Sequence, residues 1–151
     1  MPSQPRYSLN PLTQAARAAR ISTLTQEERR ILLHAGTERP FCGGLLDEHR
    51  PGLFACRLCH LPLFRSQDKF ESHTGWPSFK APYDPAHITR KEDRSHGMQR
   101  TEVLCGRCAS HLGHVFPDGP PPSGERFCIN SVCLTFFPEG IEPPQPELEQ
   151  P

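Results

Sequence analysis

Cys56-Arg57-Leu58-Cys59 and Cys105-Gly106-Arg107-Cys108 are two Cys-x-x-Cys pairs separated by 45 residues. Each pair places two sulfur atoms on one tight loop, and four thiolates form the ligand set of a tetrahedral zinc site. The spacing therefore predicts one zinc ion held by Cys56, Cys59, Cys105 and Cys108. A site with four cysteine ligands has no open position, so we expect the metal to be structural and not catalytic.

Two other interpretations of these cysteines are weaker. A single Cys-x-x-Cys pair is typical of a thioredoxin-like redox site, but the second pair disfavours that function. The segment from Cys56 to His60 also matches the Cys-x-x-Cys-His pattern of c-type haem attachment. Haem attachment requires export, and no export signal is expected in this sequence. The second Cys-x-x-Cys pair would also have no role in haem attachment. Zinc therefore remains the prediction.

The composition restricts the class of protein. The 151 residues favour one domain, and 17 basic residues balance 17 acidic ones, which argues against nucleic-acid binding. No apolar run approaches the ~20 residues of a membrane span, and no secretion signal is expected. The odd number of cysteines, seven, favours a reducing compartment, so we expect a cytoplasmic protein. Nothing in the sequence indicates an oligomer, and we expect a monomer.

The chain divides into three parts. Residues 1–22 are rich in Ala and Arg without an acidic residue, which predicts a disordered extension or, alternatively, an organelle transit peptide. The domain should occupy residues 23–138, beginning with a short helix that is capped at Thr25 and stops near Gly36. The Pro/Glu-rich residues 139–151 predict a disordered tail.

Between residues 52 and 137, short apolar segments alternate with Gly and Pro, and the 18 prolines of the chain argue against long helices. This pattern predicts a mainly β domain. We expect strands at residues 61–64, 103–104, 112–116 and 127–137, and an ordered turn at 116–122.

One of the three remaining cysteines, Cys128, lies in the strand-like segment Arg126-Phe127-Cys128-Ile129-Asn130. Side chains two residues apart share a face of a strand, so Arg126 and Asn130 should flank Cys128 while the apolar neighbours face the core. A guanidinium beside a thiol lowers the thiol pKa, and the thiolate is the nucleophile. The alternative is an ordinary buried cysteine.

Two nearby features favour the reactive interpretation. His111 and His114 provide acid and base groups just before a sharp turn, and such a proton donor beside a thiolate suits sulfur or acyl chemistry. The histidines could instead be zinc ligands, but four cysteines fill that site, or they could simply be exposed. Trp76, the only tryptophan, lies in a Gly/Pro-framed loop and could line a pocket or belong to the core.

These residues lie in blocks of sequence that resemble the B-type methionine sulfoxide reductases over about residues 25–137. The blocks, in the family's order, are Cys56-Arg-Leu-Cys-His-Leu-Pro-Leu-Phe-Arg-Ser66, Lys69-Phe-Glu-Ser72, Gly75-Trp-Pro-Ser-Phe79, Arg94-Ser-His-Gly-Met98, Arg100-Thr-Glu-Val103, His111-Leu-Gly-His-Val-Phe-Pro-Asp-Gly-Pro120 and Gly124-Glu-Arg-Phe-Cys-Ile-Asn-Ser131.

The resemblance implies two antiparallel β-sheets with a Cys₄ zinc site, and reduction of the R epimer of methionine sulfoxide, mainly in oxidised proteins. It implies that thioredoxin restores the enzyme, as in protein repair. Carried over by position, Cys128 is the nucleophile and Trp76 packs on the methyl group of the substrate. The resemblance assigns His111 and His114 to the sulfoxide oxygen, with His114 as the preferred proton donor, and it assigns orientation of the site to Asp118, Arg126 and Asn130.

The implied reaction leaves Cys128 as a sulfenic acid that a second thiol resolves. Many members of the family carry that thiol at the position of Thr74, so here another cysteine must replace it. On a regular strand, Cys133 would lie some 16 Å from Cys128, beyond the reach of a disulfide. Cys42 lies in a Pro/Gly-framed loop that can move, and we predict that it resolves Cys128, in preference to direct attack by thioredoxin or a small thiol.

A binding module without catalysis is the second class of function that we consider. Zinc-knuckle β domains of similar shape recognise ligands or partners. A pure binding protein would not need Cys128, His111, His114, Arg126 and Asn130 together, which favours the enzyme.

Overall fold

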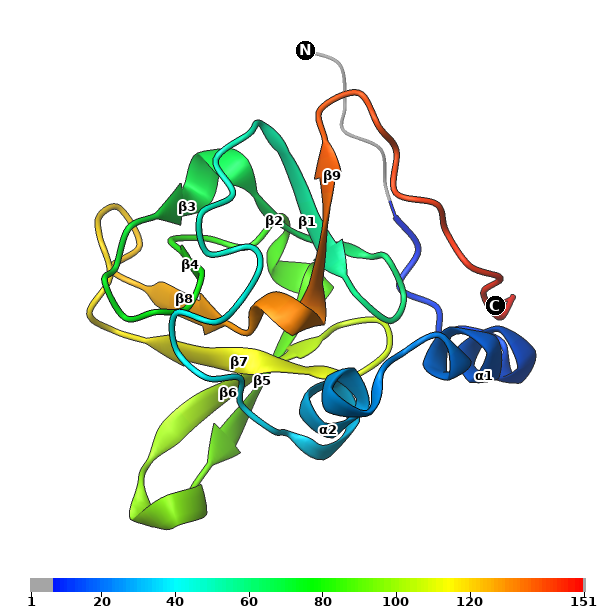
Figure 1. The fold of residues 1–151 in the computed structure, drawn as a ribbon, viewed down its shortest axis with the longest axis horizontal. Helices are drawn as coiled ribbons and strands as arrows, with labels where there is room; N and C mark the ends of the chain where they lie inside the picture. Colours follow the sequence, from blue (N-terminus) through cyan, green and yellow to red (C-terminus); the bar gives the residue numbers. More distant parts are fainter. Residues whose placement is uncertain (1–6, 151) are drawn as a thin grey trace.

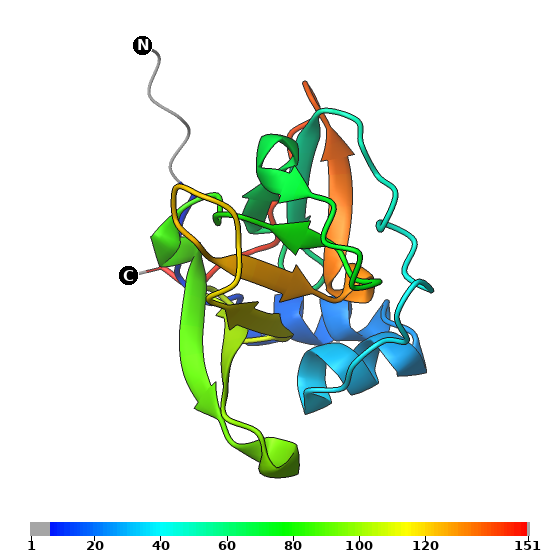
Figure 2. The same ribbon diagram turned by 90° about the vertical axis from the view of Figure 1, so that its left-hand side faces the viewer.

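The computed structural model describes residues 7–150, and within them nine β-strands form two antiparallel sheets (Figures 1 and 2). The smaller sheet has the strand order β2-β1-β9, and the larger has the order β3-β4-β8-β7-β6-β5. The prediction of a mainly β fold with two antiparallel sheets is confirmed. The strands are β1 (Gly52–Cys56), β2 (Pro62–Arg65), β3 (Lys69–Phe70), β4 (Ser78–Phe79), β5 (Ile88–Asp93), β6 (Arg100–Cys105), β7 (His111–Phe116), β8 (Arg126–Ile129) and β9 (Leu134–Pro138).

Aromatic side chains join the two sheets. Phe54 and Phe64 of the smaller sheet meet Phe79 and Phe127 of the larger one, and all four are fully buried. The rings of Phe64 and Phe79 stack with centroids 4.4 Å apart. Burying such a side chain contributes about 1.5–3 kcal/mol, so this aromatic layer fixes how the sheets face each other.

Helix α2 (Gln26–His34) is the short helix that the sequence predicts. Thr25 and Glu28 form a reciprocal capping box at its start, and the buried side chains Ile31 and Leu32 hold it against the β domain. The helix ends at Ala35, which adopts the left-handed conformation, while the N–H of Gly36 donates to the carbonyl of Arg30.

The predicted strand 127–137 is interrupted. A 3₁₀ turn at Ser131–Cys133 separates β8 from β9, and these two strands belong to different sheets. The assumption of a regular strand from Cys128 to Cys133 is therefore wrong. Cys133 is nevertheless completely buried, and its thiol donates to the carbonyl of His111 at 3.1 Å, so it is not free to move toward Cys128.

The described parts of both chain ends are ordered, contrary to the predicted disorder. Helix α1 (Gln14–Ser22) lies within the predicted N-terminal extension, and the predicted tail returns so that Leu148 pairs with Leu12 (Figure 1). Composition failed here because the polar side chains of these ends bind backbone groups of the domain instead of water. Residues 1–6 and 151 of those predictions lie outside the described residues. Among the helices of residues 7–150, none has the length and apolar character needed to cross a membrane.

Candidate functional site

The two Cys-x-x-Cys loops meet at one edge of the molecule and form what we call the metal corner. The four sulfur atoms lie within 4.8 Å of one another, with Cys56 and Cys108 3.6 Å apart and Cys59 and Cys105 3.5 Å apart. A zinc ion about 2.3 Å from each sulfur would place tetrahedral ligands about 3.8 Å apart. The four cysteines therefore bring together the ligand set that a tetrahedral zinc ion requires, at sulfur spacings close to those of such a site.

Hydrogen bonds connect the two loops of the metal corner with residues near both ends of the chain. Arg107 is buried and donates to the carbonyls of Ser8 and Cys59 and to the side chain of Gln145. Arg20 of helix α1 donates to the carbonyls of Arg57 and Leu58. Arg20 thus satisfies two carbonyls of the first loop, and Arg107 joins the two loops to each other and to Ser8 and Gln145, so both ends of the chain pack here.

A second site lies on the larger sheet, where the register aligns one side chain from each of five strands. Lys91 of β5 pairs with Glu102 of β6, which pairs with His114 of β7. His114 pairs with Cys128 of β8, and Cys128 pairs with Ser78 of β4. Residues directly opposite each other share a face of the sheet, so this row brings the predicted nucleophile and proton donor together.

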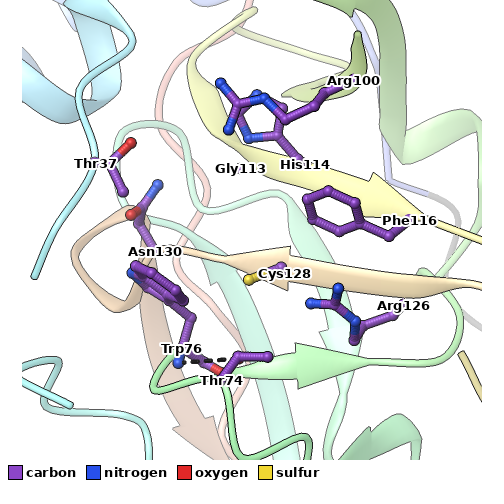
Figure 3. Close-up of a pocket in the computed structure, with 10 residues that line it drawn as sticks. All are labelled: Thr37, Thr74, Trp76, Arg100, Gly113, His114, Phe116, Arg126, Cys128 and Asn130. Carbon is purple, nitrogen blue, oxygen red and sulfur yellow. Dashed lines mark hydrogen bonds between the residues drawn. The ribbon is translucent and has the colours of Figure 1, made fainter. Parts of the chain in front are cut away.

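Cys128 opens into a cavity of about 240 Å³, which we call the Cys128 pocket (Figure 3). In Figure 3, Trp76 and Asn130 lie on one side of the sulfur, Arg126 and Phe116 on another, and His114 above it. Within the described chain the pocket is lined by Thr37, Thr74, Trp76, Arg100, Gly113, His114, Phe116, Arg126, Cys128 and Asn130. Five of the predicted site residues therefore share one cavity.

Both predicted histidines are oriented by carboxylates that the sequence analysis missed. His114 Nε2 lies 2.7 Å from Asp93 Oδ2, and His111 Nδ1 lies 2.7 Å from Glu102 Oε2. The two imidazoles lie 5.6 Å apart, although His111 is buried behind the wall of the pocket and does not line it. Burial lowers the pKa of His114, and Asp93 only partly opposes that effect, so the ring is neutral near pH 7.

The environment of Cys128 corrects one prediction. Burial raises the pKa of the Cys128 thiol above its usual value, and the Arg126 guanidinium and Thr74 hydroxyl only partly offset this rise. The sequence indicated a lowered pKa because Arg126 and Asn130 flank the sulfur, as they do in the structure. The neighbours are correct, but desolvation in the pocket outweighs their charge.

Asp118 takes part through Arg126 and does not line the pocket. Its carboxylate binds the Arg126 guanidinium through two hydrogen bonds of 2.9 and 3.1 Å, and the guanidinium lies 4.5 Å from the centre of the Phe116 ring. The charge of Asp118 thus holds the guanidinium in place beside Cys128.

Cys42 is exposed and is absent from the walls of the Cys128 pocket. Its loop nevertheless rests against the loop of Trp76, because the N–H of Phe41 donates to the carbonyl of Gly75 at 2.7 Å. Phe41 itself is 67% exposed, so the segment has few buried contacts to hold it.

Several other pocket residues were also missed. Gly113 admits the close approach of β8, since a Cβ there would lie 2.0 Å from the carbonyl oxygen of Cys128. Because side chains two residues apart share a face of a strand, Arg100 lies on the same face as Glu102. The sequence alone does not reveal that this strand pairs with the strand of His114, so Arg100 could not be assigned to the pocket. Thr37 and Phe116 carry no chemical signal of their own.

A cysteine and a histidine paired across two strands, in a small pocket with an aromatic wall, are typical of a thiol-dependent enzyme, here on a β scaffold with four cysteines that could bind a metal. Comparison with known proteins agrees with this class. Residues 24–138 match the SelR domain. The relatives include the peptide methionine sulfoxide reductase MsrB of Xylella fastidiosa strain M23, 60% identical over 134 residues, which are 89% of this chain and 86% of the relative.

Two further relatives carry the same name. The protein of Caulobacter vibrioides strain NA1000 is 56% identical over 140 residues, 93% of this chain and 88% of the relative. That of Pseudomonas putida strain W619 is 55% identical over 115 residues, 76% of this chain and 86% of the relative. The chain belongs to the SelR family of MsrB methionine sulfoxide reductases, and the predicted enzyme class is confirmed.

Proposed function

We propose that this chain reduces the R epimer of methionine sulfoxide, mainly in oxidised proteins, and thereby repairs them. The observation that supports this most directly is the pairing of Cys128 with His114 on adjacent strands inside one pocket. Sulfoxide sulfur is a poor electrophile until its oxygen is protonated, so the reaction requires a sulfur nucleophile and a proton donor at one place.

The pocket supports binding of the end of an oxidised methionine side chain. Trp76 and Phe116 offer aromatic walls, and the methyl group of the substrate packs on the Trp76 indole. The sulfoxide oxygen then points to His114, with His111 behind it. Arg126, held by Asp118, and the amide of Asn130 orient the site and act on the charge that develops at Cys128.

The first step transfers one oxygen atom. The Cys128 sulfur attacks the sulfoxide sulfur while the thiol proton passes through His114 to the sulfoxide oxygen. The protonated oxygen then passes to the Cys128 sulfur while the bonds from the substrate sulfur to that oxygen and to Cys128 break, so methionine leaves and Cys128 becomes a sulfenic acid. Burial favours a protonated Cys128 thiol and a neutral His114. The thiol then supplies the one proton that this step requires, and the neutral imidazole can accept it and pass it on.

The second thiol in this proposal is Cys42. Its attack on the sulfenic acid forms a disulfide and releases water, and thioredoxin then reduces the disulfide by thiol–disulfide exchange. The exposure of Cys42 and the contact of its loop with the Trp76 loop support this assignment. Cys133 is buried, and its thiol already has a partner.

The metal corner holds one zinc ion in a structural role. When bound, the ion cross-links the two loops, and the site has no open position for a substrate. The enzyme acts as a monomer in the cytoplasm, without membrane or nucleic-acid partners. The contacts of Arg17 and Arg20 with the metal corner support this location over an organelle, since a cleaved transit peptide would remove them.

Thioredoxin-coupled NADPH oxidation with each epimer of a methionine sulfoxide peptide tests the proposal. We expect turnover of the R epimer alone, no turnover by Cys128→Ser, and loss of thioredoxin recycling in Cys42→Ser. Adding Thr74→Cys to Cys42→Ser should restore recycling, because Thr74 lines the same pocket as Cys128.

Two results would contradict the proposal. Zinc-replete protein that reduces neither epimer, even with dithiothreitol, is not the proposed reductase. An intramolecular disulfide in Cys42→Ser after one turnover would show that Cys42 does not resolve Cys128.

A further inference from the structure

Glu38 lies just before the Cys42 loop, is only 6% exposed, and has no place in the proposed reaction. It nevertheless connects two residues of the Cys128 pocket with the turn that follows β8. Its N–H donates to Asn130 Oδ1, its carbonyl accepts from Trp76 Nε1, and its Oε1 accepts from the N–H of Val132, each at 3.0 Å.

Two of these bonds hold residues of the pocket wall beside the reactive sulfur. Trp76 and Asn130 come from distant parts of the sequence and have no hydrogen bond to each other in the described chain. The Asn130 amide is fixed at its other end by donation to the carbonyl of Leu112 at 3.0 Å. Within the described residues, Glu38 is therefore the link that sets the distance between indole and amide.

The carboxylate of Glu38 anchors this link. Oε1 binds the turn that follows β8, while Oε2 is buried without a partner. A Cβ at Gly43 would lie 2.3 Å from Oε2 and 2.2 Å from Ser131 Oγ, so the backbone after Cys42 is seated directly against the carboxylate. A buried carboxylate costs free energy unless it forms hydrogen bonds or ion pairs. Among the described residues, no Lys, Arg or His side chain forms an ion pair with this one.

We propose that Glu38 is a positioning residue of the Cys128 pocket, one that holds the Trp76 indole and the Asn130 amide in place in the pocket wall beside the reactive sulfur. The inference rests on the proposed function for its effect on catalysis. Its effect on the geometry of the pocket is independent of that function.

The first test compares Glu38→Ala with Glu38→Gln, with Glu139→Ala as a control at an exposed glutamate. Dithiothreitol serves as the reductant so that resolution does not limit the rate. We expect Glu38→Ala to lose about 10- to 100-fold in kcat/KM, since displacements of about 1 Å cost that much. Glu38→Gln keeps the acceptor for Val132 and should recover most of this loss, and Glu139→Ala should match the wild type.

The second test uses Trp76, the only tryptophan, as a reporter without substrate. Acrylamide should quench the fluorescence of Glu38→Ala more strongly than that of the wild type or Glu38→Gln, because the backbone carbonyl that accepts from the indole is no longer anchored by the bond from the carboxylate to Val132. If Glu38→Ala does not fold, Glu38→Asp replaces it with the same expectation, because its shorter side chain draws the carboxylate away from Val132.

The third test is the pH profile of Cys128 alkylation in a Cys42→Ser background. The charged and titratable groups around the sulfur are Arg126, His114, Arg100 and Glu38. Removing the Glu38 charge in Glu38→Gln should shift the profile to lower pH, and an unchanged profile would show that the Glu38 carboxylate does not act on the Cys128 sulfur.

Wild-type kcat/KM and wild-type quenching in Glu38→Ala, or in Glu38→Asp where that variant replaces it, would overturn the inference. If the wild type reduces no sulfoxide but Trp76 becomes accessible in Glu38→Ala, the proposed function fails and the positioning role stands.

Discussion

The metal corner and the Cys128 pocket satisfy their polar groups in opposite ways. At the metal corner, the guanidinium groups of Arg17 and Arg20 donate to backbone carbonyls of both loops. Around the pocket, Glu38 Oε2, Arg100 Nε and His111 Nε2 are buried without a partner, three of the five such atoms in the described residues. Buried polar groups are normally paired. The paired carbonyls make the metal corner rigid, whereas the unpaired atoms near the pocket remain available to form hydrogen bonds.

Replacing a ligand at the metal corner should have the largest effect. We expect Cys105→Ser to lose both metal and cooperative folding, because structural zinc contributes apparent binding free energies of about 10–16 kcal/mol. Thermal unfolding and metal content measured on the same sample check this expectation. If Cys105→Ser bound no metal but kept the stability of the wild type, the metal would have no structural role at this corner.

Replacing the nucleophile should leave the corner intact. Cys128→Ser should lower turnover by about 10³-fold or more, as loss of a nucleophile commonly does, with metal content and melting temperature close to wild type. Cys133→Ala serves as the control, since Cys133 is buried outside the pocket, and it should retain the first turnover. Loss of metal from Cys128→Ser would show that the two regions are not independent.

Weakening the contacts of the chain ends should affect the corner alone. Arg107→Met removes hydrogen bonds to a buried charged group, each worth about 1.5–3 kcal/mol, so release of metal to a chelator should accelerate by about tenfold or more. Arg94→Met, at an exposed hairpin arginine, should release metal at the wild-type rate. Equal rates in both variants would mean that the chain ends do not protect the site.

The smallest effect should follow from a change in the pocket. Arg126 lowers the pKa of the Cys128 thiol, whose net value burial has raised. Arg126→Gln should raise that pKa further, so at neutral pH less thiolate forms and alkylation slows about three- to tenfold. Iodoacetamide kinetics against pH in a Cys42→Ser background measure the change, with Arg90→Gln as control because Arg90 pairs with Glu125 away from the pocket. A faster Arg126→Gln would contradict this account of the site.

Short-range patterns were sufficient to predict much of this site. The two Cys-x-x-Cys pairs predicted the four residues that meet at the metal corner, because local loops determine the sulfur positions. Alternation along Arg126, Cys128 and Asn130 predicted the face that opens into the pocket, since a strand has a fixed period of two.

Features that depend on long-range pairing could not be predicted in this way. Spaced three apart, His111 and His114 should lie on opposite faces of a regular strand. The register of β6 and β7 shifts beside Leu104, so that His111 reaches the carboxylate of Glu102, which is itself paired with His114. The raised pKa of Cys128 and the order of the chain ends likewise follow from burial and contacts that only the folded chain defines.

The pairing of Leu12 with Leu148 has a consequence for the connectivity of the fold. Because these two residues lie opposite each other, a short linker could join Leu148 directly to Leu12 in place of the residues beyond them. The chain could then be opened at the exposed tip of the β5–β6 hairpin, around Ser95–Gly97. Such a circular permutant would keep every strand pairing while making β5 and β6 the new ends of the protein.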